Sequence, residues 1–178
     1  MFEGSEGQVS TMPKKIASRR RQPRATRPYM PGYGISTTKK SMLPWKWAED
    51  RLRKSRQYWM VTVRPDGRPH VMPVWGLWRD DGFYFSTGGR SRKARNLAAN
   101  PNCIVCNEDA EQGVIVEGRA SVWRDEARFE DFAREYQKKY KWDIRGMKEP
   151  LYRVTPRVAF GLYEKKFPTT ATRWLFEA

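Results

Sequence analysis

The sequence has very little histidine and cysteine. His70 is the single histidine, and Cys103 and Cys106 are the two cysteines. A Ser-His-Asp triad, or a metal centre built from several His and Cys ligands, therefore lacks residues to form it. The segment NCIVCN reads as a strand, in which residues three apart point to opposite faces, so we interpret both thiols as structural. The sequence predicts no metal site.

Long apolar runs are also missing. No stretch approaches the roughly 20 apolar residues that cross a bilayer, and the N-terminus has no apolar segment of the kind found in secretory signals. The few cysteines agree with a reducing compartment. We expect a cytoplasmic protein without a membrane span.

Positive charge, in contrast, is abundant and unevenly distributed. The 178 residues carry a formal net charge of +15, and residues 1–43 hold nine Lys or Arg against two Glu. This segment is rich in Pro and Gly and poor in large apolar side chains, so it buries too little surface to offset the entropy of ordering it. We interpret residues 1–43 as a basic extension, either mobile or lying over the body, and residues 44–178 as one domain. The extension is either a solvated arm or a weak contact to nucleic acid or an anionic surface.

Apolar periodicity predicts about seven short strands and three small helices. Helices are expected over residues 43–56, 91–101 and 124–143, and strands over 58–64, 69–79, 83–87, 102–108, 113–123, 157–165 and 171–178. Tight turns containing Asp-Gly separate the first three strands, which predicts an antiparallel meander. The expected fold is mainly β with some α, an α+β chain built as an antiparallel β-barrel.

The segment TGGRSRKARNLAANP (87–101) is suited to bind a phosphate group. Ser91 is placed to cap a helix whose first turn contains Arg92 and Lys93. The free N–H groups of a first helical turn favour an anion, and Arg and Lys add charge-assisted hydrogen bonds. The alternative is that these basic residues form a solvated helix face.

The ordered segments RPHVMPVWG, DGFYFST, SRKARNLAANP and VIVEG resemble the FMN-binding split barrel of the pyridoxamine 5'-phosphate oxidase superfamily. Within it, residues 44–178 are similar to the flavin/deazaflavin oxidoreductases, many of which use the deazaflavin coenzyme F420. The resemblance implies a homodimer with the cofactor in a cleft between the subunits. It also implies that the ring lies along Val71, Met72, Pro73, Val74 and Trp75, that Phe85, Ser86 and Thr87 flank it, and that Ser91, Arg92 and Lys93 bind its phosphate.

The chain departs from a true pyridoxamine 5'-phosphate oxidase at its C-terminus. That enzyme ends in an Arg/His-containing segment that grips the substrate phosphate, whereas this chain ends in TRWLFEA. The resemblance therefore implies an oxidoreductase that transfers hydride to another electron-poor small molecule. F420 is favoured over FMN because its longer anionic tail suits the basic body, including Arg51, Arg53, Lys54 and Arg56.

Other functions fit the same composition. The chain is alternatively an FMN-binding protein with oxidase or reductase activity, or a carrier of a ring cofactor or haem without turnover. A nucleic-acid-binding β-barrel would use Trp59, Trp75, Trp78 and Tyr84 to stack bases. Tyr58, Trp75, Trp78 and Tyr84 either line the cleft or belong to the core. His70 is a candidate proton donor or a packed residue, and no side chain is assigned a catalytic role.

Overall fold

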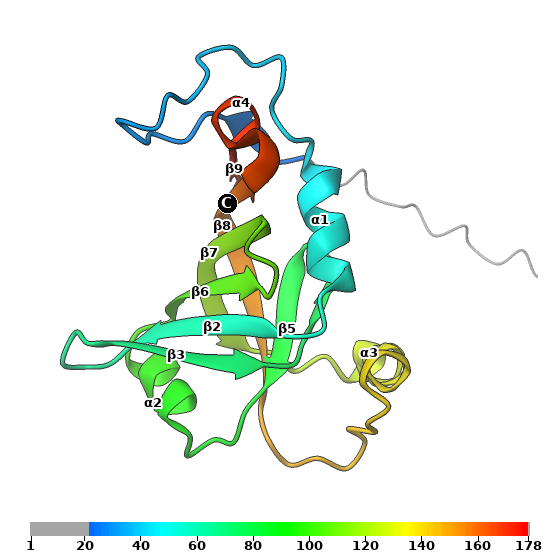
Figure 1. The fold of residues 1–178 in the computed structure, drawn as a ribbon. Coiled ribbons are helices and arrows are strands. Elements are labelled where there is room, and N and C mark those ends of the chain that lie inside the picture. The colour runs from blue at the N-terminus through cyan, green and yellow to red at the C-terminus, as the bar shows by residue number, and fades with distance from the viewer. Residues whose placement is uncertain (1–21, 178) are drawn as a thin grey trace, which may run out of the picture.

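An antiparallel sheet forms most of the structure (Figure 1). The computed structural model describes residues 22–177, and nine strands are found within them. The strands are β1 Arg24–Thr26, β2 Tyr58–Val63, β3 Pro69–Val74, β4 Leu77–Arg79, β5 Gly82–Ser86, β6 Asn102–Asn107, β7 Gln112–Val122, β8 Leu151–Tyr163 and β9 Thr172–Leu175. Their order is β1-β9-β8-β7-β6-β2-β3, and β5 pairs with both β4 and β8. This confirms the expected antiparallel α+β split barrel.

Four helices pack around the sheet in the described residues. They are α1 Trp45–Lys54, α2 Arg92–Ala99, α3 Glu126–Tyr140 and the single turn α4 Phe167–Thr170, which follows a 3-10 turn at Glu164–Lys166. In Figure 1, α2 lies beside the β2–β3 hairpin and α3 lies apart from it, next to the end of β5. The three helices expected from the sequence are confirmed within a few residues at their ends.

The predicted meander of three strands is confirmed in its two hairpins, β2–β3 and β4–β5, but its middle strand is divided. The segment expected as one strand over 69–79 is two strands, β3 and β4, separated by Trp75 and Gly76. A Cβ on Gly76 would overlap the Phe83 ring and the Tyr84 carbonyl, so the chain turns at a position where only glycine fits. After this turn β5 pairs with β4 and β8 rather than with β3. The outer edge of β3 is left without a strand neighbour in the described chain.

The β4–β5 hairpin closes through a two-residue turn. Asp80 and Asp81 both have positive φ, 47° and 53°, as a type I′ turn requires. Aspartate tolerates this region better than most residues because its short side chain can hydrogen-bond locally. The hairpin therefore follows the turn chemistry expected from the sequence.

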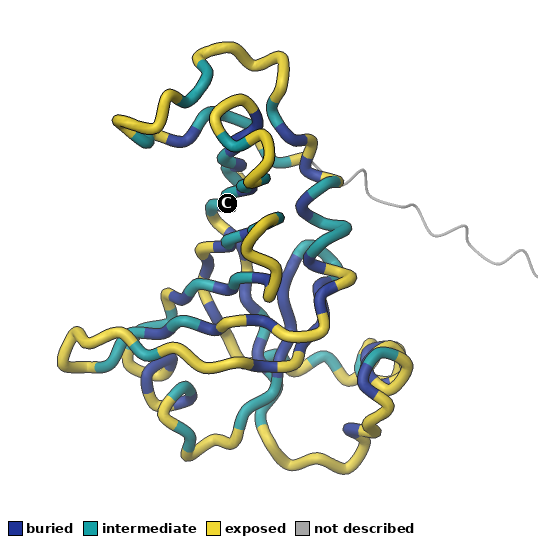
Figure 2. Tube along the Cα trace, viewed as in Figure 1, coloured by how far each residue is buried: buried dark blue, intermediate teal, exposed yellow. Residues whose placement is uncertain are grey.

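Two hydrophobic clusters form the core, shown as the dark-blue stretches of Figure 2. The larger lies inside the barrel and includes Tyr58, Trp78 and Trp174, each about 1% exposed. The smaller lies between the β4–β5 hairpin and α3, and includes Tyr84 and Phe132. Of the four aromatic residues with two interpretations, Tyr58, Trp78 and Tyr84 thus belong to the core, whereas Trp75 is 45% exposed.

Residues 22–43 lie over the body, which is one of the two interpretations of the basic extension. Strand β1 pairs with β9, and the Arg27 guanidinium donates to the carbonyls of Thr38 and Ala171. The Leu43 amide donates to Thr172 Oγ1 at 2.8 Å, and the Leu43 side chain is buried. Residues 1–21, which carry the SRRR run, lie outside the described residues. The division of the chain at residue 43 stays a prediction.

Deleting residues 1–43 is expected to lower the thermal midpoint by about 5 to 10 °C. The deletion removes a paired strand, the Arg27 hydrogen bonds and the buried Leu43 side chain, together about 2 to 4 kcal/mol. Circular dichroism melting measures the change. The control is a chain lacking residues 1–21, which keeps all of these contacts. Equal midpoints for the two shortened chains would show that residues 22–43 add no stability.

Candidate functional site

Strand β3 is the edge strand next to the basic helix α2. Its inner side pairs with β2, from Tyr58↔Val74 to Val63↔Pro69, and its outer side has no strand partner in residues 22–177. Val71 and Met72 are 52% and 44% exposed, and Pro73 is also exposed. An edge strand of this kind presents unpaired main-chain N–H and C=O groups, which can bind a planar ligand bearing polar atoms along its rim.

The five residues expected along a ring do not all face the same way. Val74 is buried against Tyr58 and faces the core, so its side chain is not available to a ligand. Trp75 lies just beyond the strand and is half-exposed. The edge therefore offers main-chain groups along β3 and one aromatic side chain at its end.

The segment after β5 connects the core to α2. Phe85 is fully buried, with its ring 5.4 Å from that of Tyr152, so only its main chain can approach a ligand. Ser86 Oγ donates to the Pro150 carbonyl at 3.2 Å. Thr87 Oγ1 lies 3.1 Å from Ser91 Oγ, which fixes the start of α2 against the end of β5.

Helix α2 begins as the sequence predicts. Ser91 is the N-cap, and its side chain accepts from the Ala94 amide at 3.2 Å. Arg92 is the first helical residue and is exposed, whereas Lys93 is half-buried. No acidic residue lies in the first turn. The helix therefore starts with free N–H groups and two cations, and its own first turn has no carboxylate to neutralise them.

Positive charge from two elements meets at the start of β3. The pKa of His70 is lowered, first by burial and then by the charges of Arg64, Lys93 and Arg92. Burial lowers the pKa of Lys93 as well. Within the described residues neither Lys93 nor Arg92 forms a salt bridge, and the buried Nε of Arg64 has no hydrogen-bond partner. Half-buried cations without counter-ions fit an anionic group such as a phosphate.

A buried polar network fixes α2 against the β2–β3 hairpin. Asn96 is fully buried, and its Nδ2 donates to Thr62 Oγ1 at 2.9 Å. Thr62 Oγ1 lies 3.5 Å from His70 Nδ1. The basic first turn is therefore held in place relative to the edge strand. Asn96 and Arg64 were missed at the sequence level, although an Asn among the apolar residues of a short helix is a signal of a buried polar contact.

The basic residues of α1 do not join this site. Arg51 stacks on Trp47 and donates to Gln112, and Arg53 pairs with Glu49. Arg56, which follows α1, donates to the Lys139 carbonyl. These contacts hold the side chains around α1, and their attraction of an anionic tail stays a prediction. Arg64 and Arg68 lie on the β2–β3 turn, close to α2. The pKa of Asp66, which lies between them on this turn, is lowered first by its hydrogen bond with Arg68, and the charge of Arg92, at the start of α2, contributes to lowering it.

No group of three or more potential metal ligands is found among the described residues. Cys103 is buried, and burial raises its pKa to about 12, which keeps it an unreactive thiol at neutral pH. None of the helices in residues 22–177 is long and apolar enough to cross a membrane.

Comparison with known proteins identifies the family. The family model described as pyridoxamine 5'-phosphate oxidase matches residues 45–162. The chain belongs to this family. The match spans β2 to β8 and therefore includes β3, the β5–α2 segment and α2. Among curated proteins, none matches the chain.

Several solved structures share the fold at low sequence identity. A conserved hypothetical protein, Rv2991 from Mycobacterium tuberculosis, aligns with a TM-score of 0.63 and 20% identity over 74% of this chain and 92% of that one. An F420 reductase aligns with a TM-score of 0.51 and 22% identity over 62% and 94%. HutZ, the heme storage protein from Vibrio cholerae, aligns with a TM-score of 0.51 and 19% identity over 64% and 87%. At these identities the likeness establishes the fold.

Proposed function

We propose that the protein is an oxidoreductase that binds coenzyme F420, or alternatively FMN, in a cleft between two identical subunits. It transfers hydride between this ring and an electron-poor small molecule. The observation that carries the proposal is the basic, acid-free first turn of α2, fixed beside an edge strand whose outer main-chain groups are unpaired. A ring cofactor with a phosphate needs both features: the edge strand binds the ring, and the first turn of α2 binds the phosphate.

Each part of the site has a separate task. The main chain of β3, together with Trp75, binds and orients the ring, and Ser91, Arg92 and Lys93 bind the phosphate. When bound, such a ring supplies the capacity to accept or donate hydride. The chain excludes water from one face of the ring through the apolar side chain of Val71, which is exposed along the edge.

The basic β2–β3 turn favours F420 over FMN. Arg68 is paired with Asp66 at 2.7 Å, whereas the buried Nε of Arg64 has no hydrogen-bond partner, so Arg64 is the cation that this turn adds near α2. The resemblance to deazaflavin oxidoreductases implies a cofactor with an anionic glutamate tail after its phosphate, and a basic surface next to α2 suits such a tail. FMN ends at its phosphate and would leave these residues unused.

A true pyridoxamine 5'-phosphate oxidase activity is not part of the proposal. The C-terminal segment, which would have to grip the substrate phosphate, is instead strand β9, paired with β1 and β8. The guanidinium of Arg173 donates to Thr26 Oγ1 at 3.0 Å. This arginine is therefore engaged in the contact between β9 and β1.

Titration of the purified protein with F420 and with FMN tests the function, with ring fluorescence as the signal. We expect one ring to bind far more tightly than single-stranded RNA at physiological salt, because contacts to the ring persist when salt screens the phosphate contacts. Haem, followed by its absorption band, is the third ligand. RNA binding that survives added salt, without binding of either ring, would contradict the proposal. Haem binding alone would favour the carrier function.

A further inference from the structure

The C-terminal end of α3 contacts the junction between β3 and β4, formed by Trp75 and Gly76. The rings of Trp75 and Tyr140 stack with centroids 4.8 Å apart and planes 8° apart. Tyr140 Oη accepts from the Gly76 amide at 2.9 Å and lies 2.8 Å from the Gly76 carbonyl and 2.7 Å from that of Arg56. The hydroxyl carries one proton, so it donates to one of the two carbonyls at a time.

Lys139 completes these contacts from the same turn of helix. Its ammonium donates to the Gly76 carbonyl at 3.1 Å and to Tyr58 Oη at 2.8 Å. It also lies 5.0 Å from the Tyr58 ring centroid and 5.3 Å from that of Tyr140. Both polar groups of the Gly76 main chain are thus satisfied by α3 and not by a strand.

The junction depends on these contacts because the sheet does not reach it. The β2–β3 pairing ends at Val74, and the β4–β5 pairing begins at Leu77. Trp75 stays half-exposed, with Tyr140 stacked on one face of its ring. The orientation of the aromatic side chain at the end of the ring site is therefore set by α3.

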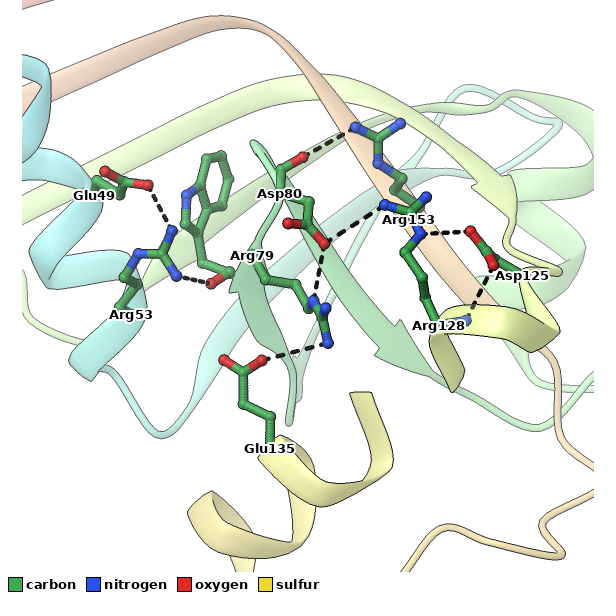
Figure 3. Close-up of polar contacts among 9 residues, drawn as sticks. Glu49, Arg53, Arg79, Asp80, Asp125, Arg128, Glu135 and Arg153 are labelled. Atoms are coloured by element: carbon green, nitrogen blue, oxygen red, sulfur yellow. Dashed lines mark hydrogen bonds and ion pairs between the residues drawn. The ribbon is translucent and has the colours of Figure 1, made fainter. Parts of the chain in front are cut away.

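Helix α3 is attached to the body independently of this end. Its buried Phe132 and Tyr136 pack in the smaller core cluster. Figure 3 shows two ion pairs that join it to the β4–β5 hairpin, Arg79 with Glu135 at 3.4 Å and Arg128 with Asp80 at 3.8 Å. Loss of the Lys139 and Tyr140 hydrogen bonds therefore leaves the helix in place.

We infer that Lys139 and Tyr140 are positioning residues for the ring site, which hold Trp75 and the end of β3 in the arrangement that binds the ring. This inference rests on the proposed function, and it assigns α3 a part in binding a ligand that α3 does not itself touch. The site is thus determined by three separate segments: the edge strand, the basic helix and the end of α3.

The protonation of Lys139 gives this role a pH dependence. Burial lowers its pKa to about 8, whereas the same ammonium in solvent titrates near 10.5. Between pH 8 and 10.5, Lys139 in solvent is protonated, whereas Lys139 in contact with Gly76 and Tyr58 is not. The contact of Lys139 with the junction therefore becomes more favourable as pH rises through 8. The charged and titratable groups that face Lys139 are Glu135, Arg56, Glu108, Tyr58 and Tyr140. Burial raises the pKa of Tyr140 to about 12, so it stays protonated throughout this range.

The test uses Tyr140→Phe and Lys139→Met in the full chain. The first substitution keeps the stacked ring and removes the hydroxyl, and the second keeps the aliphatic stem and removes the ammonium. Lys138→Met, on the exposed face of the same helix, is the matched control. Amide exchange at Gly76, followed by NMR, reports the junction without any ligand, and ring titration reports the site.

We expect the protection factor of the Gly76 amide and the affinity for the ring each to fall about tenfold in Tyr140→Phe, the effect of one lost hydrogen bond in a buried setting. Lys139→Met should lower ring affinity and abolish the rise in affinity from pH 7.5 to 9.5 that the unchanged protein shows. Lys138→Met should leave all three readouts unchanged.

The outcomes separate this inference from the function on which it rests. Faster Gly76 exchange with unchanged ring affinity in both variants would overturn the positioning role and leave the proposed function intact. Unchanged Gly76 exchange would also overturn it, because another contact would then hold the junction. A wild-type protein that binds neither ring would remove the proposed function, and the inference with it. Thermal melting confirms that each variant is folded.

Discussion

Replacing Lys93 with alanine is expected to weaken binding of the ring cofactor roughly ten- to hundredfold, or about 1.5 to 3 kcal/mol. Lys93 is a half-buried cation at the start of α2 without a salt bridge in the described chain, so a bound phosphate would be its counter-ion. Arg92→Ala should cost a similar amount, because Arg92 begins the same turn. Fluorescence titration measures both.

The stability of the fold should change little in these variants. Burial lowers the pKa of Lys93, which means that the folded protein gains nothing from its charge in the absence of an anion. Lys40→Ala, an exposed residue far along the chain from α2, is the charge control and should have a much smaller effect that high salt removes. Equal losses of ring affinity on replacing Lys40, Arg92 and Lys93 would instead indicate attraction by the overall positive charge. The basic residues of α2 would then form a solvated helix face.

The elements near the phosphate were predictable because their signals are local. A capping serine followed by Arg and Lys predicts the start of α2, and the structure places Ser91 at that cap. The Asp-Asp-Gly sequence predicts a tight hairpin turn, and Asp80 and Asp81 form it. Such features depend on a few neighbouring residues, so sequence alone is sufficient to find them.

The pairing of the strands was less predictable because it depends on distant residues. Pro73 and Gly76 interrupt the segment from Pro69 to Arg79, but the position of the turn at Gly76 follows from the distant packing of Phe83 and Tyr84. The pairing of β1 with β9 joins residues almost 150 positions apart, and a three-residue strand has no periodicity of its own. The sequence therefore predicted the segments of the barrel, but neither the break at Gly76 nor the pairing of β5 with β8.

The site shows the same division between local and distant contacts. The exposure of Val71, Met72 and Trp75 fits a ligand surface, whereas Phe85 and Val74 are buried and can contribute only main-chain groups. The contacts of Lys139 and Tyr140 with Gly76 cross more than 60 positions. The helical spacing of Tyr136 and Tyr140 indicates an apolar face, but nothing in that spacing indicates which strand it meets.

Substituting Val61 with arginine is expected to convert a homodimer to a monomer and to abolish ring binding. Val61 lies on the outer face of the sheet, where it is paired with Val71 on one side and Ile104 on the other. Trp59, on the same face, is 47% exposed. A groove of about 470 Å³ continues this apolar surface across β2, β6, β7 and β8.

The proposed homodimer would cover this face, because contiguous apolar surface on one subunit is commonly buried against a second copy. The face is also continuous with the edge of β3, so a subunit covering it would form the other wall of the ring cleft. A buried guanidinium without a partner opposes such contact by several kcal/mol. Loss of the dimer and loss of ring affinity should therefore occur together.

Sedimentation velocity at micromolar concentration, with and without the ring, measures both effects. Tyr29→Arg is the control, since Tyr29 is 88% exposed and lies in the segment before α1, away from the outer face of the sheet. It should remain dimeric and bind the ring normally. A wild-type monomer that still binds the ring tightly would contradict the shared cleft, because one subunit would then supply every contact that the ring needs.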